Sequence, residues 1–381
     1  MRRLLALILC GLELLLFAGQ NGLRRNFREV EQLLVVQTMG LDAKSNGVTL
    51  SLAAAGDSEE GVRRMEADGV SVSAAMDRIR GYSFEEELFS PHIGRLLLGE
   101  KLAEQGIEST LAYITRSPEL RLDMPLFVVR GGEASGAVMD VGSGDKGICD
   151  VMHIIEQDLK RRGESGVTTA AQILRDTARC GSSLICALDL GTASETTAAP
   201  DEGESAPTGK SVAPMGYAIL REGRLCRYLT EDQAIAVGLL KNAPGRATVE
   251  LLDRHGEATV LEINGGGCRL RPVWEGETLR GVEVACDVRA SLLEHGGRGA
   301  LDEEDLDYLT ARLESKLAGF LSAALQASKE LKADYLCLAE TLERADPAAW
   351  RSLDREFIDL LPELELKITV RAKLNEMNDM K

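Results

Sequence analysis

The sequence is poor in aromatic and basic residues, and both shortages exclude functions. Phe, Trp and Tyr make up 4% of the 381 residues, and 44 Lys and Arg stand against 61 Asp and Glu, for a formal net charge of −17. The phosphate backbone of a nucleic acid is repelled by such an acidic field, and few rings are present on which bases could stack. We therefore expect no nucleic-acid binding. An acidic body is not attracted to anionic lipids either, so membrane attachment needs a dedicated segment.

The motifs of common catalytic sites are also missing. The sequence has no GxSxG elbow, and no set of Ser, His and Asp indicates a triad. The abundant carboxylates leave a paired-acid glycosidase open, but two Trp and six Tyr give little with which to line a sugar cleft. We therefore expect a protein without catalytic residues, cofactor or metal.

Two weak binding signals are present. Residues 142–147, GSGDKG, fit GxGxxG and precede a predicted helix, which is the context of a dinucleotide site. However, Asp140 interrupts the apolar stretch before them and no strand with an acidic end follows, so a glycine loop is the better interpretation. Cys149 and His153 lie one helical turn apart and could offer two metal ligands. No second pair follows, which favours an exposed helix face.

The cysteines do not form an evident disulfide framework. Cys10 lies in the N-terminal apolar stretch, which leaves seven for the folded body, and no CxxC pair is present. Seven thiols cannot all pair. Cys286 lies at an inward-facing position of a predicted strand, and several others resemble it. We interpret these residues as small buried thiols.

The N-terminus has the layout of an export signal. Two arginines precede an apolar stretch over residues 4–19, which ends in small residues. The stretch is shorter than the roughly 20 residues that span a bilayer, and Glu13 interrupts it. A lipoprotein signal continues directly with the Cys that takes the lipid, but Gln20 occupies this position. We expect residues 1–21 to be a signal or anchor segment without a lipid-attachment residue, either cleaved or retained as a short anchor.

One segment of the remaining chain reads as a linker. Residues 191–212 are rich in Ser, Thr, Ala, Gly and Pro, and such a stretch cannot form a core. Short strands and helices are mixed before it, over residues 22–190, and after it, over residues 213–376. No sustained βαβ repeat appears. We expect an α+β fold of two to three separate mixed-sheet domains with flanking helices, and not one doubly wound sheet.

Three local expectations concern strands and a helix. Residues 92–98 read as a short apolar strand that begins at His92. Residues 264–267, NGGG, read as a hairpin loop between two strands. From Asp302 to about Leu331 a long amphipathic helix is predicted, whose apolar stripe we assign to the core.

Several segments, in this order and spacing, resemble one known family. Residues 28–31, REVE, lead into a strand that ends in residues 39–42, MGLD, and residues 92–103, HIGRLLLGEKLA, form the most recognisable block. Further matching positions are Arg116, Glu119–Arg121, Pro125–Arg130, Gly216–Ala218, Leu229–Glu231, Asp334, Pro347, Trp350 and the final alternating strand. Over residues 24–374 the chain thereby resembles the C-subunits of spore germinant receptors, the Ger(x)C proteins.

This resemblance implies a function. Ger(x)C proteins are exported lipoproteins on the outer face of the spore inner membrane. They form a receptor with two integral membrane subunits, an A-type and a transporter-like B-type subunit, and nutrient binding to it starts germination. They are not known as enzymes. Their fold of three mixed α/β domains implies a further boundary within residues 116–150. Gln20 departs from the family, whose members carry the lipidated Cys there.

The resemblance also gives candidate scaffold or interface positions: Gly40, Asp42, His92, Gly99, Glu100, Asp334 and Trp350. Gly40 and Gly99 are expected at strand ends, where backbone freedom is useful, and Asp42 can accept backbone amides in a turn. We expect a non-enzymatic extracytoplasmic subunit of a nutrient germinant receptor, needed for receptor assembly or signalling. The alternative is a free-standing exported solute-binding protein or hydrolase, which would need a deep cleft.

Overall fold

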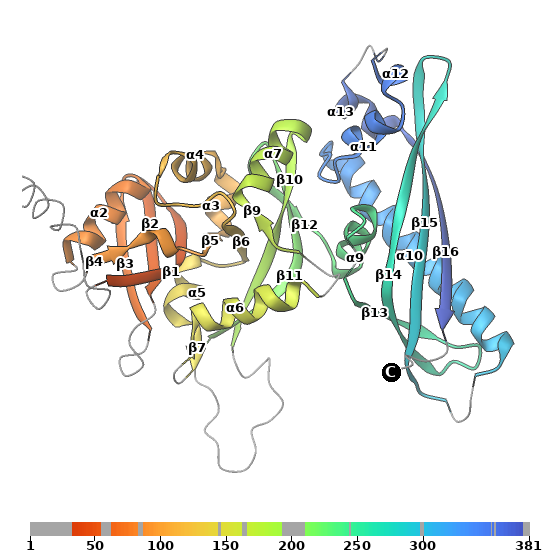
Figure 1. Ribbon diagram of the computed structural model, residues 1–381, viewed down its shortest axis with the longest axis horizontal. Helices are drawn as coiled ribbons and strands as arrows, with labels where there is room; N and C mark the ends of the chain where they lie inside the picture. Colours follow the sequence, from red (N-terminus) through yellow and green to blue (C-terminus); the bar gives the residue numbers. More distant parts are fainter. Residues whose placement is uncertain are drawn as a thin grey trace, which may run out of the picture.

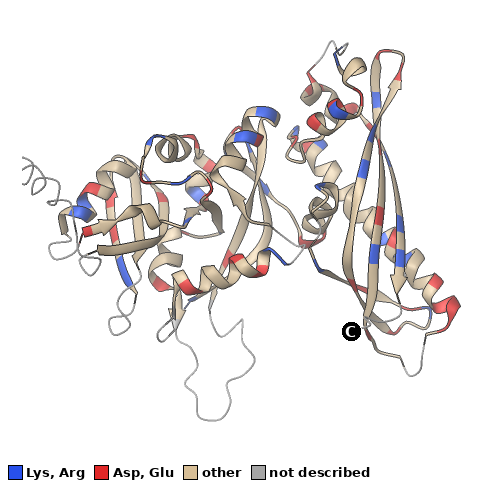
Figure 2. Ribbon diagram, viewed as in Figure 1, with Lys and Arg blue, Asp and Glu red and all other residues tan. Residues whose placement is uncertain are grey.

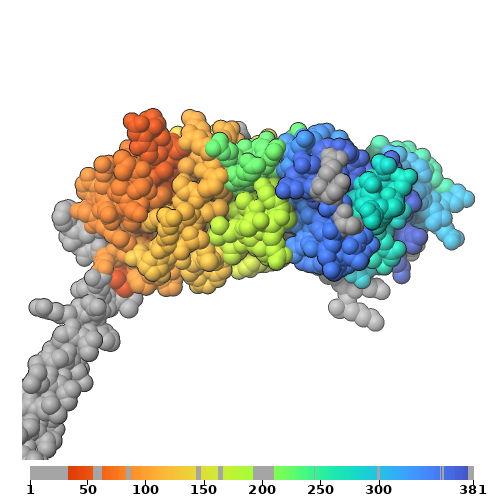
Figure 3. Space-filling view, turned by 90° about the horizontal axis from the view of Figure 1, so that it is seen from above, coloured from red at the N-terminus to blue at the C-terminus, as the bar shows by residue number. Residues whose placement is uncertain are grey.

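The described residues form two large sheets that lie side by side (Figure 1). The molecule is elongated (Figure 3). The computed structural model describes residues 33–54, 62–82, 87–143, 146–161, 166–192, 210–243, 245–297, 301–351, 353 and 356–375. The N-terminal segment, residues 1–21 with Gln20, lies outside these ranges. Within them, no helix has both the length and the apolar character needed to cross a membrane.

The first sheet has ten strands, in the order β12-β11-β10-β6-β5-β1-β2-β3, with β4 beside β1 and β9 beside β6. Its strands are β1 (Leu33–Lys44), β2 (Gly47–Ala54), β3 (Arg63–Gly69), β4 (Glu87–Phe89), β5 (Arg95–Gly99), β6 (Pro125–Arg130), β9 (Thr168–Thr169), β10 (Ser182–Thr192), β11 (Lys210–Arg221) and β12 (Arg224–Tyr228). The central strands β1, β5, β6 and β10 pair in parallel. The outer strands β2, β3, β11 and β12 pair antiparallel.

Helices cover both faces of this sheet. One face carries α2 (Val72–Tyr82), α3 (Glu100–Gln105), α4 (Glu108–Arg116) and α7 (Ala170–Cys180), and the other carries α5 (Ala134–Asp140) and α6 (Ile148–Leu159). Successive side chains of a strand point to opposite faces. Leu96 and Leu98 of β5 therefore enter one core, and Leu97 between them enters the other. A central parallel strand buried on both faces must be apolar throughout, which explains the uniform Leu run.

The second sheet has four strands, β13 (Ala247–Leu252), β14 (Ala258–Glu275), β15 (Thr278–His295) and β16 (Glu365–Asn375), in this order. The first three pair antiparallel, and β16 pairs in parallel with β15. Charged residues alternate with apolar ones along these strands (Figure 2), as expected for a sheet with one face in water. Helix α10 (Glu303–Leu331) packs against the other face.

Helix α10 confirms the core assignment of the long amphipathic helix. Asp302 caps it by accepting the Asp305 amide at 2.8 Å, and its stripe is fully buried at Leu309, Leu313 and Leu317. Shorter helices complete this part: α11 (Leu338–Ala345), α12 (Pro347–Trp350), α13 (Phe357–Leu360) and the 3₁₀ turn η4 (Leu361–Glu363).

Helix α9 (Glu231–Leu240) lies between the two sheets. All its residues from Ala234 to Leu240 are buried, so it is apolar on every side, as a helix enclosed by protein must be. Leu184 of β10 and Ile219 of β11 belong to the same apolar cluster as the second sheet. The two sheets therefore share one core at their junction.

The α+β fold class with more than one sheet is confirmed, but the sheets are not divided where the sequence indicated. Strand β10 reaches Thr192, β11 begins at Lys210, and the two pair antiparallel along their length. The predicted linker 191–212 therefore joins neighbouring strands of one sheet, and the change of sheet follows β12. Within residues 116–150, β6 lies at the centre of the same sheet, between β5 and β10.

Two local expectations are wrong. Ser90–His92 form a 3₁₀ turn, η3, and β5 begins only at Arg95, because Pro91 fixes its φ and has no amide for a strand ladder. Residues 264–267 are not a hairpin loop, because β14 runs through them and pairs with β15 on both sides of a register shift at Ile263/Gly265. The chain reverses instead at 276–277, between β14 and β15.

Candidate functional site

Asp42 joins β1 to the first turn of α5. Its carboxylate accepts the amides of Ala134 at 2.7 Å and Ser135 at 2.8 Å, and the residue is 5% exposed. The first amides of a helix have no partner within the helix, and a negative charge is favourable there. Burial raises the pKa of Asp42, and the two amide hydrogen bonds oppose this shift. The side chain thus caps a helix that lies 92 residues further along the chain.

Gly40 and Gly99 lie where Asp42 and α5 pack closely against the sheet. A Cβ on Gly99 would stand 2.0 Å from Asp42 Oδ1, and a Cβ on Gly40 would stand 2.4 Å from Ser51 Oγ and 3.0 Å from Val138 of α5. Neither glycine has a positive φ. Close approach of neighbouring atoms, and not backbone freedom, is therefore the reason for both glycines. Three of the candidate positions meet in one structural unit.

Glu100 connects α3 to the far edge of the sheet. Its Oε1 accepts the Tyr228 hydroxyl of β12 at 2.7 Å, and the Arg130 guanidinium of β6 lies 5.0 Å from the centre of the same ring. Burial and the neighbouring Glu100 carboxylate raise the pKa of Tyr228. Glu100 therefore joins α3 to the edge strand β12.

Arg95 was not singled out from the sequence, although it lies in the block 92–103. Its Nε donates to Glu156 of α6 at 2.6 Å, and its Nη1 donates to Thr38 Oγ1 at 3.3 Å and to the Cys149 carbonyl at 3.1 Å. The Arg95 side chain is 9% exposed. A cation within an apolar strand was the available signal, since a buried charge requires a partner. The partner itself could not be read from the sequence.

The remaining candidate positions lie apart from this unit. Asp334 accepts the amides of Leu338 at 2.7 Å and Ala339 at 2.9 Å and so caps α11. It is 2% exposed, and burial raises its pKa to about 7. The Trp350 ring packs 5.5 Å from that of Phe357, and the exposed His92 is the last residue of the 3₁₀ turn before the central strand β5.

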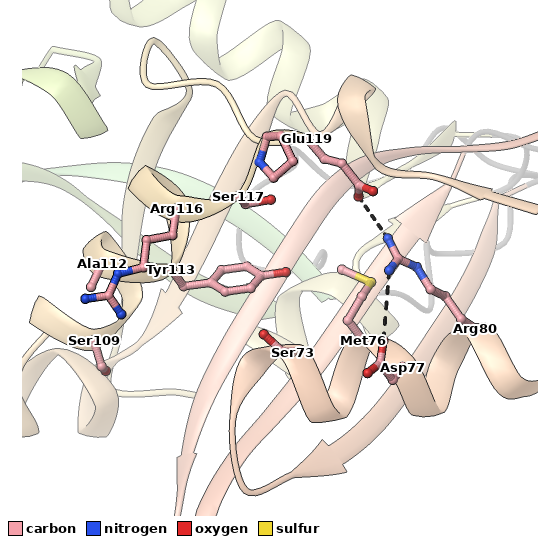
Figure 4. Close-up of a pocket in the computed structure, with 11 residues that line it drawn as sticks. Ser73, Met76, Asp77, Arg80, Ser109, Ala112, Tyr113, Arg116, Ser117 and Glu119 are labelled. Carbon is pink, nitrogen blue, oxygen red and sulfur yellow. Dashed lines mark hydrogen bonds and ion pairs between the residues drawn. The ribbon is translucent and has the colours of Figure 1, made fainter.

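A groove on the first part of the molecule has the character of a binding surface (Figure 4). It lies between α2, α4 and residues 117–119 and has a volume of about 560 Å³. The groove is lined by Ser73, Met76, Asp77, Arg80, Ser109, Ala112, Tyr113, Arg116, Ser117, Pro118 and Glu119. Tyr113 reaches into it from α4, and burial raises the pKa of this phenol. Arg116 and Glu119 were noted in the sequence, but the contact between α2 and α4 follows from packing on the sheet.

Charges of both signs line this groove. Arg80 pairs with Glu119 at 2.8 Å and lies 3.9 Å from Asp77. The Arg80 and Glu119 side chains are each 42% exposed, so a solute can compete for either. The lining contains no histidine or cysteine that could act as base or nucleophile. The arrangement offers charged and hydroxyl partners to a polar molecule.

Of the two weak sequence signals, the glycine segment lies partly outside the described residues, at 144–145, and the two candidate metal ligands do not face the same way. The glycine segment contributes the short strands β7 (Gly142–Ser143) and β8 (Lys146–Gly147), and a Cβ on Gly147 would stand 2.2 Å from Val62. Cys149 is buried while His153 is exposed on the same helix. Across the described ranges, no group of three or more His, Cys, Asp and Glu residues could hold a metal ion.

Together, the fold and these residues define a two-sheet α+β protein whose sequence motifs cap helices and hold strands together. Residues 26–159 match the family described as "Spore germination protein N-terminal domain", and residues 215–378 match "Spore germination B3/ GerAC like, C-terminal". The chain belongs to the Ger(x)C family of spore germinant receptor subunits, whose members are membrane-associated.

A solved structure agrees with this fold. The crystal structure of the GerBC protein is similar over 88% of this chain and 96% of its own, with a TM-score of 0.56 and 17% sequence identity. At this identity the likeness concerns the fold alone. No curated protein sequence matches the chain.

Proposed function

We propose that this protein is a non-enzymatic, extracytoplasmic subunit of a nutrient germinant receptor, and that it is needed for receptor assembly or signalling. This proposal rests on the family matches over residues 26–159 and 215–378. The geometry supports it, because Asp42, Gly99, Glu100 and Asp334 are engaged in caps and close packing. Such residues stabilise a scaffold that presents its surface to other proteins.

The partners in this proposal are two integral membrane subunits, of A-type and transporter-like B-type. Attachment to the outer face of the spore inner membrane would come from residues 1–21 or from these partners, because Gln20 replaces the lipidated Cys. A Gln20→Cys variant tests this point. If residues 1–21 or the partners suffice, native and variant proteins occur equally in the membrane fraction of spores. If lipid is needed, only the variant does.

The central experiment compares spores with and without the gene. Release of dipicolinic acid is followed with a panel of amino acids and sugars, and separately with a trigger that bypasses nutrient receptors. The proposal expects one nutrient response to be lost and the bypass response to remain. Unchanged responses to every nutrient, in a strain from which related receptor genes are also deleted, would contradict it.

The charged groove favours a second candidate, solute binding. An amino acid carries an ammonium and a carboxylate group, which Glu119 and Arg80 could accept as partners. Calorimetry of the purified protein with amino acids tests this reading. Binding that is lost in Arg80→Ala and kept in Arg121→Ala, an exposed arginine outside the groove, would support it. If spores lacking the gene then germinate normally, the free-standing solute-binding alternative is favoured over the receptor role.

A further inference from the structure

Two of the seven described cysteines are direct cross-strand neighbours. Cys268 of β14 lies opposite Cys286 of β15 in the register of the antiparallel pair. Both are buried in the apolar cluster of the second sheet, so their side chains lie on the same face, and each thiol shifts the pKa of the other.

The backbone around Cys268 shows which kind of pair this is. Its amide donates to Asn242 Oδ1 at 2.9 Å, and its carbonyl accepts from Asn242 Nδ2 at 3.1 Å. Both backbone groups of Cys268 thus point away from β15. The two cysteines therefore form a non-hydrogen-bonded pair, in which the Cα atoms approach to about 4.5 Å. Cysteines joined by a disulfide have Cα atoms about 4.4–6.8 Å apart, and this separation lies within that range.

Two other cysteines meet where the two parts of the molecule touch. Cys180 is the last residue of α7, on the first sheet, and Cys337 is the N-cap of α11, in the second part. Each thiol shifts the pKa of the other, and the residues are half-buried. An ion pair between Arg179 and Glu340 joins the same two helices beside them at 2.5 Å. The contact between α7 and α11 therefore does not depend on the thiols alone.

The other three described thiols have different neighbours. Cys149 bonds to Thr38 Oγ1 and the Ala53 carbonyl, and Cys226 donates to the Ile219 carbonyl. Cys186 donates to the carbonyl of Ala187. Seven thiols thus divide into two pairs and three single residues, which resolves the odd count of the sequence.

We infer that Cys180–Cys337 and Cys268–Cys286 are sites of disulfide formation in the folded protein. This inference rests on the proposed extracytoplasmic location, where thiols are oxidised. Each pair gives up two protons and two electrons as its S–S bond forms. The oxidant is a disulfide, such as that of a thiol oxidase or of oxidised glutathione, whose own S–S bond breaks to give two thiols.

One thiol of each pair has a lowered pKa, which favours its attack on the disulfide of the oxidant. The neighbouring thiol of Cys180 lowers the pKa of Cys337, and that of Cys268 lowers the pKa of Cys286. The thiolate is the attacking species in thiol–disulfide exchange. Because Cys337 is half-buried whereas Cys286 is buried, the junction pair is expected to oxidise first when the folded protein meets an oxidant.

The two links have different consequences. Cys268–Cys286 would fix the register of one hairpin. Cys180–Cys337 would tie α7 to α11 and thereby hold the two sheets in one orientation, across 157 positions of the sequence.

The test maps disulfides in the purified full chain, incubated with oxidised or reduced glutathione and then alkylated. Trypsin places Cys268 and Cys286 on separate peptides, 255–269 and 281–289, and Cys337 on 333–344. Chymotrypsin cleavage after Leu184 separates Cys180 from Cys186. We expect two linked peptide pairs, each lighter by two hydrogen atoms than the sum of its parts, and near-complete loss of alkylation at these four cysteines.

Matched variants and a measurement in spores complete the test. Cys337→Ser should abolish the Cys180 link and leave Cys268–Cys286 intact, while Cys226→Ser should change neither. Absence of both links in the oxidised sample overturns the inference. If links form in the purified protein but alkylation in intact spores finds four free thiols, the inference is overturned for the cell. Loss of the nutrient response in the deletion strain is measured separately, so failure of the disulfide inference can be distinguished from failure of the receptor role.

Discussion

Asp42 Oδ1 lies 2.0 Å from the point at which a Cβ on Gly99 would stand. The two residues come from neighbouring parallel strands, β1 and β5, which pair from Thr38↔Arg95 to Leu41↔Leu98. Because the carboxylate must reach the first amides of α5, it crosses directly over the end of β5. Glycine at position 99 is thus a requirement of the cap on α5.

Replacement of Gly99 by alanine should therefore destabilise the fold. The new methyl group would force Asp42 away from Ala134 and Ser135, or shift β5. Overpacking of this kind costs about 1–3 kcal/mol, and the lost cap adds about 1 kcal/mol. Urea unfolding followed by circular dichroism measures the loss.

Gly319→Ala is the matched control for this prediction. Gly319 is exposed within α10, and a Cβ there meets nothing within 4 Å. Since glycine is unfavourable inside a helix, this change should stabilise the protein by about 0.5–1 kcal/mol. Equal stability of the two alanine variants would show that Asp42 does not occupy the space beside Gly99.

The sequence predicted elements with local signals and missed relations between distant segments. The stripe of α10, its start at Asp302 and the alternation of β16 depend on neighbouring residues, and the structure contains each of them. The Leu run of β5 is apolar throughout, so it gives no periodicity. Its place between β1 and β6 depends on pairing with residues far along the chain.

The candidate site shows the same division. Asp42, Gly99 and Glu100 could be noted as motif positions, but the partners Ala134 and Tyr228 could not. The glycines at 265–267 were misread because a Gly run is typical of loops. They lie within β14 because its neighbours approach closely: a Cβ on Gly267 would stand 2.2 Å from Asn242 Oδ1.

The buried pair of Arg95 and Glu156 gives a second prediction. Glu156→Ala would leave the Arg95 guanidinium buried without its counter-charge, and removal of one partner from a buried pair costs about 3–5 kcal/mol. The Glu156 side chain is 17% exposed, so we expect a loss near the lower limit, about 3 kcal/mol. Chemical denaturation measures it.

An exposed ion pair serves as the control here. Arg121 donates to Asp123 at 2.9 Å, and both side chains are more than 60% exposed, at 69% and 65%. Asp123→Ala should cost less than about 1 kcal/mol. The double change Arg95→Met with Glu156→Leu should recover much of the stability lost in Glu156→Ala, because it leaves no unpaired charge. A double variant as unstable as the single one would contradict this account.

The hydrogen bond from Tyr228 to Glu100 gives a third prediction. Tyr228→Phe keeps the ring beneath Arg130 and removes only the hydroxyl that donates to Glu100 at 2.7 Å. A hydrogen bond to a charged group contributes about 1.5–3 kcal/mol, so thermal unfolding should occur at a lower temperature. Tyr82→Phe is the control, since Tyr82 is 78% exposed and its change should be within about 0.5 kcal/mol. Equal effects of the two changes would refute the role of Glu100.

The buried carboxyl of Asp334 should make the folded protein less stable as the pH rises. Its ordinary pKa is 3.8, and burial raises the folded-state pKa to about 7. Between these values the folded protein retains a proton that the unfolded chain has released. The stabilisation is therefore fully present below pH 3.8 and is lost as the pH rises through about 7.

Asp334→Asn removes this titration and keeps an oxygen that can accept an amide from α11. The stability of the variant relative to the native protein should therefore rise with pH, by at most about 4 kcal/mol at 1.36 kcal/mol per pKa unit. Urea unfolding of both proteins at several pH values between the two pKa values gives this difference directly. Asp302→Asn is the control of opposite sign, because the Asp305 amide lowers the pKa of Asp302. The cost of that change should be present near neutral pH and vanish as the pH falls. A stability difference for Asp334→Asn that does not change with pH would mean that the buried carboxyl is ionised in the folded protein, held by the amides of Leu338 and Ala339.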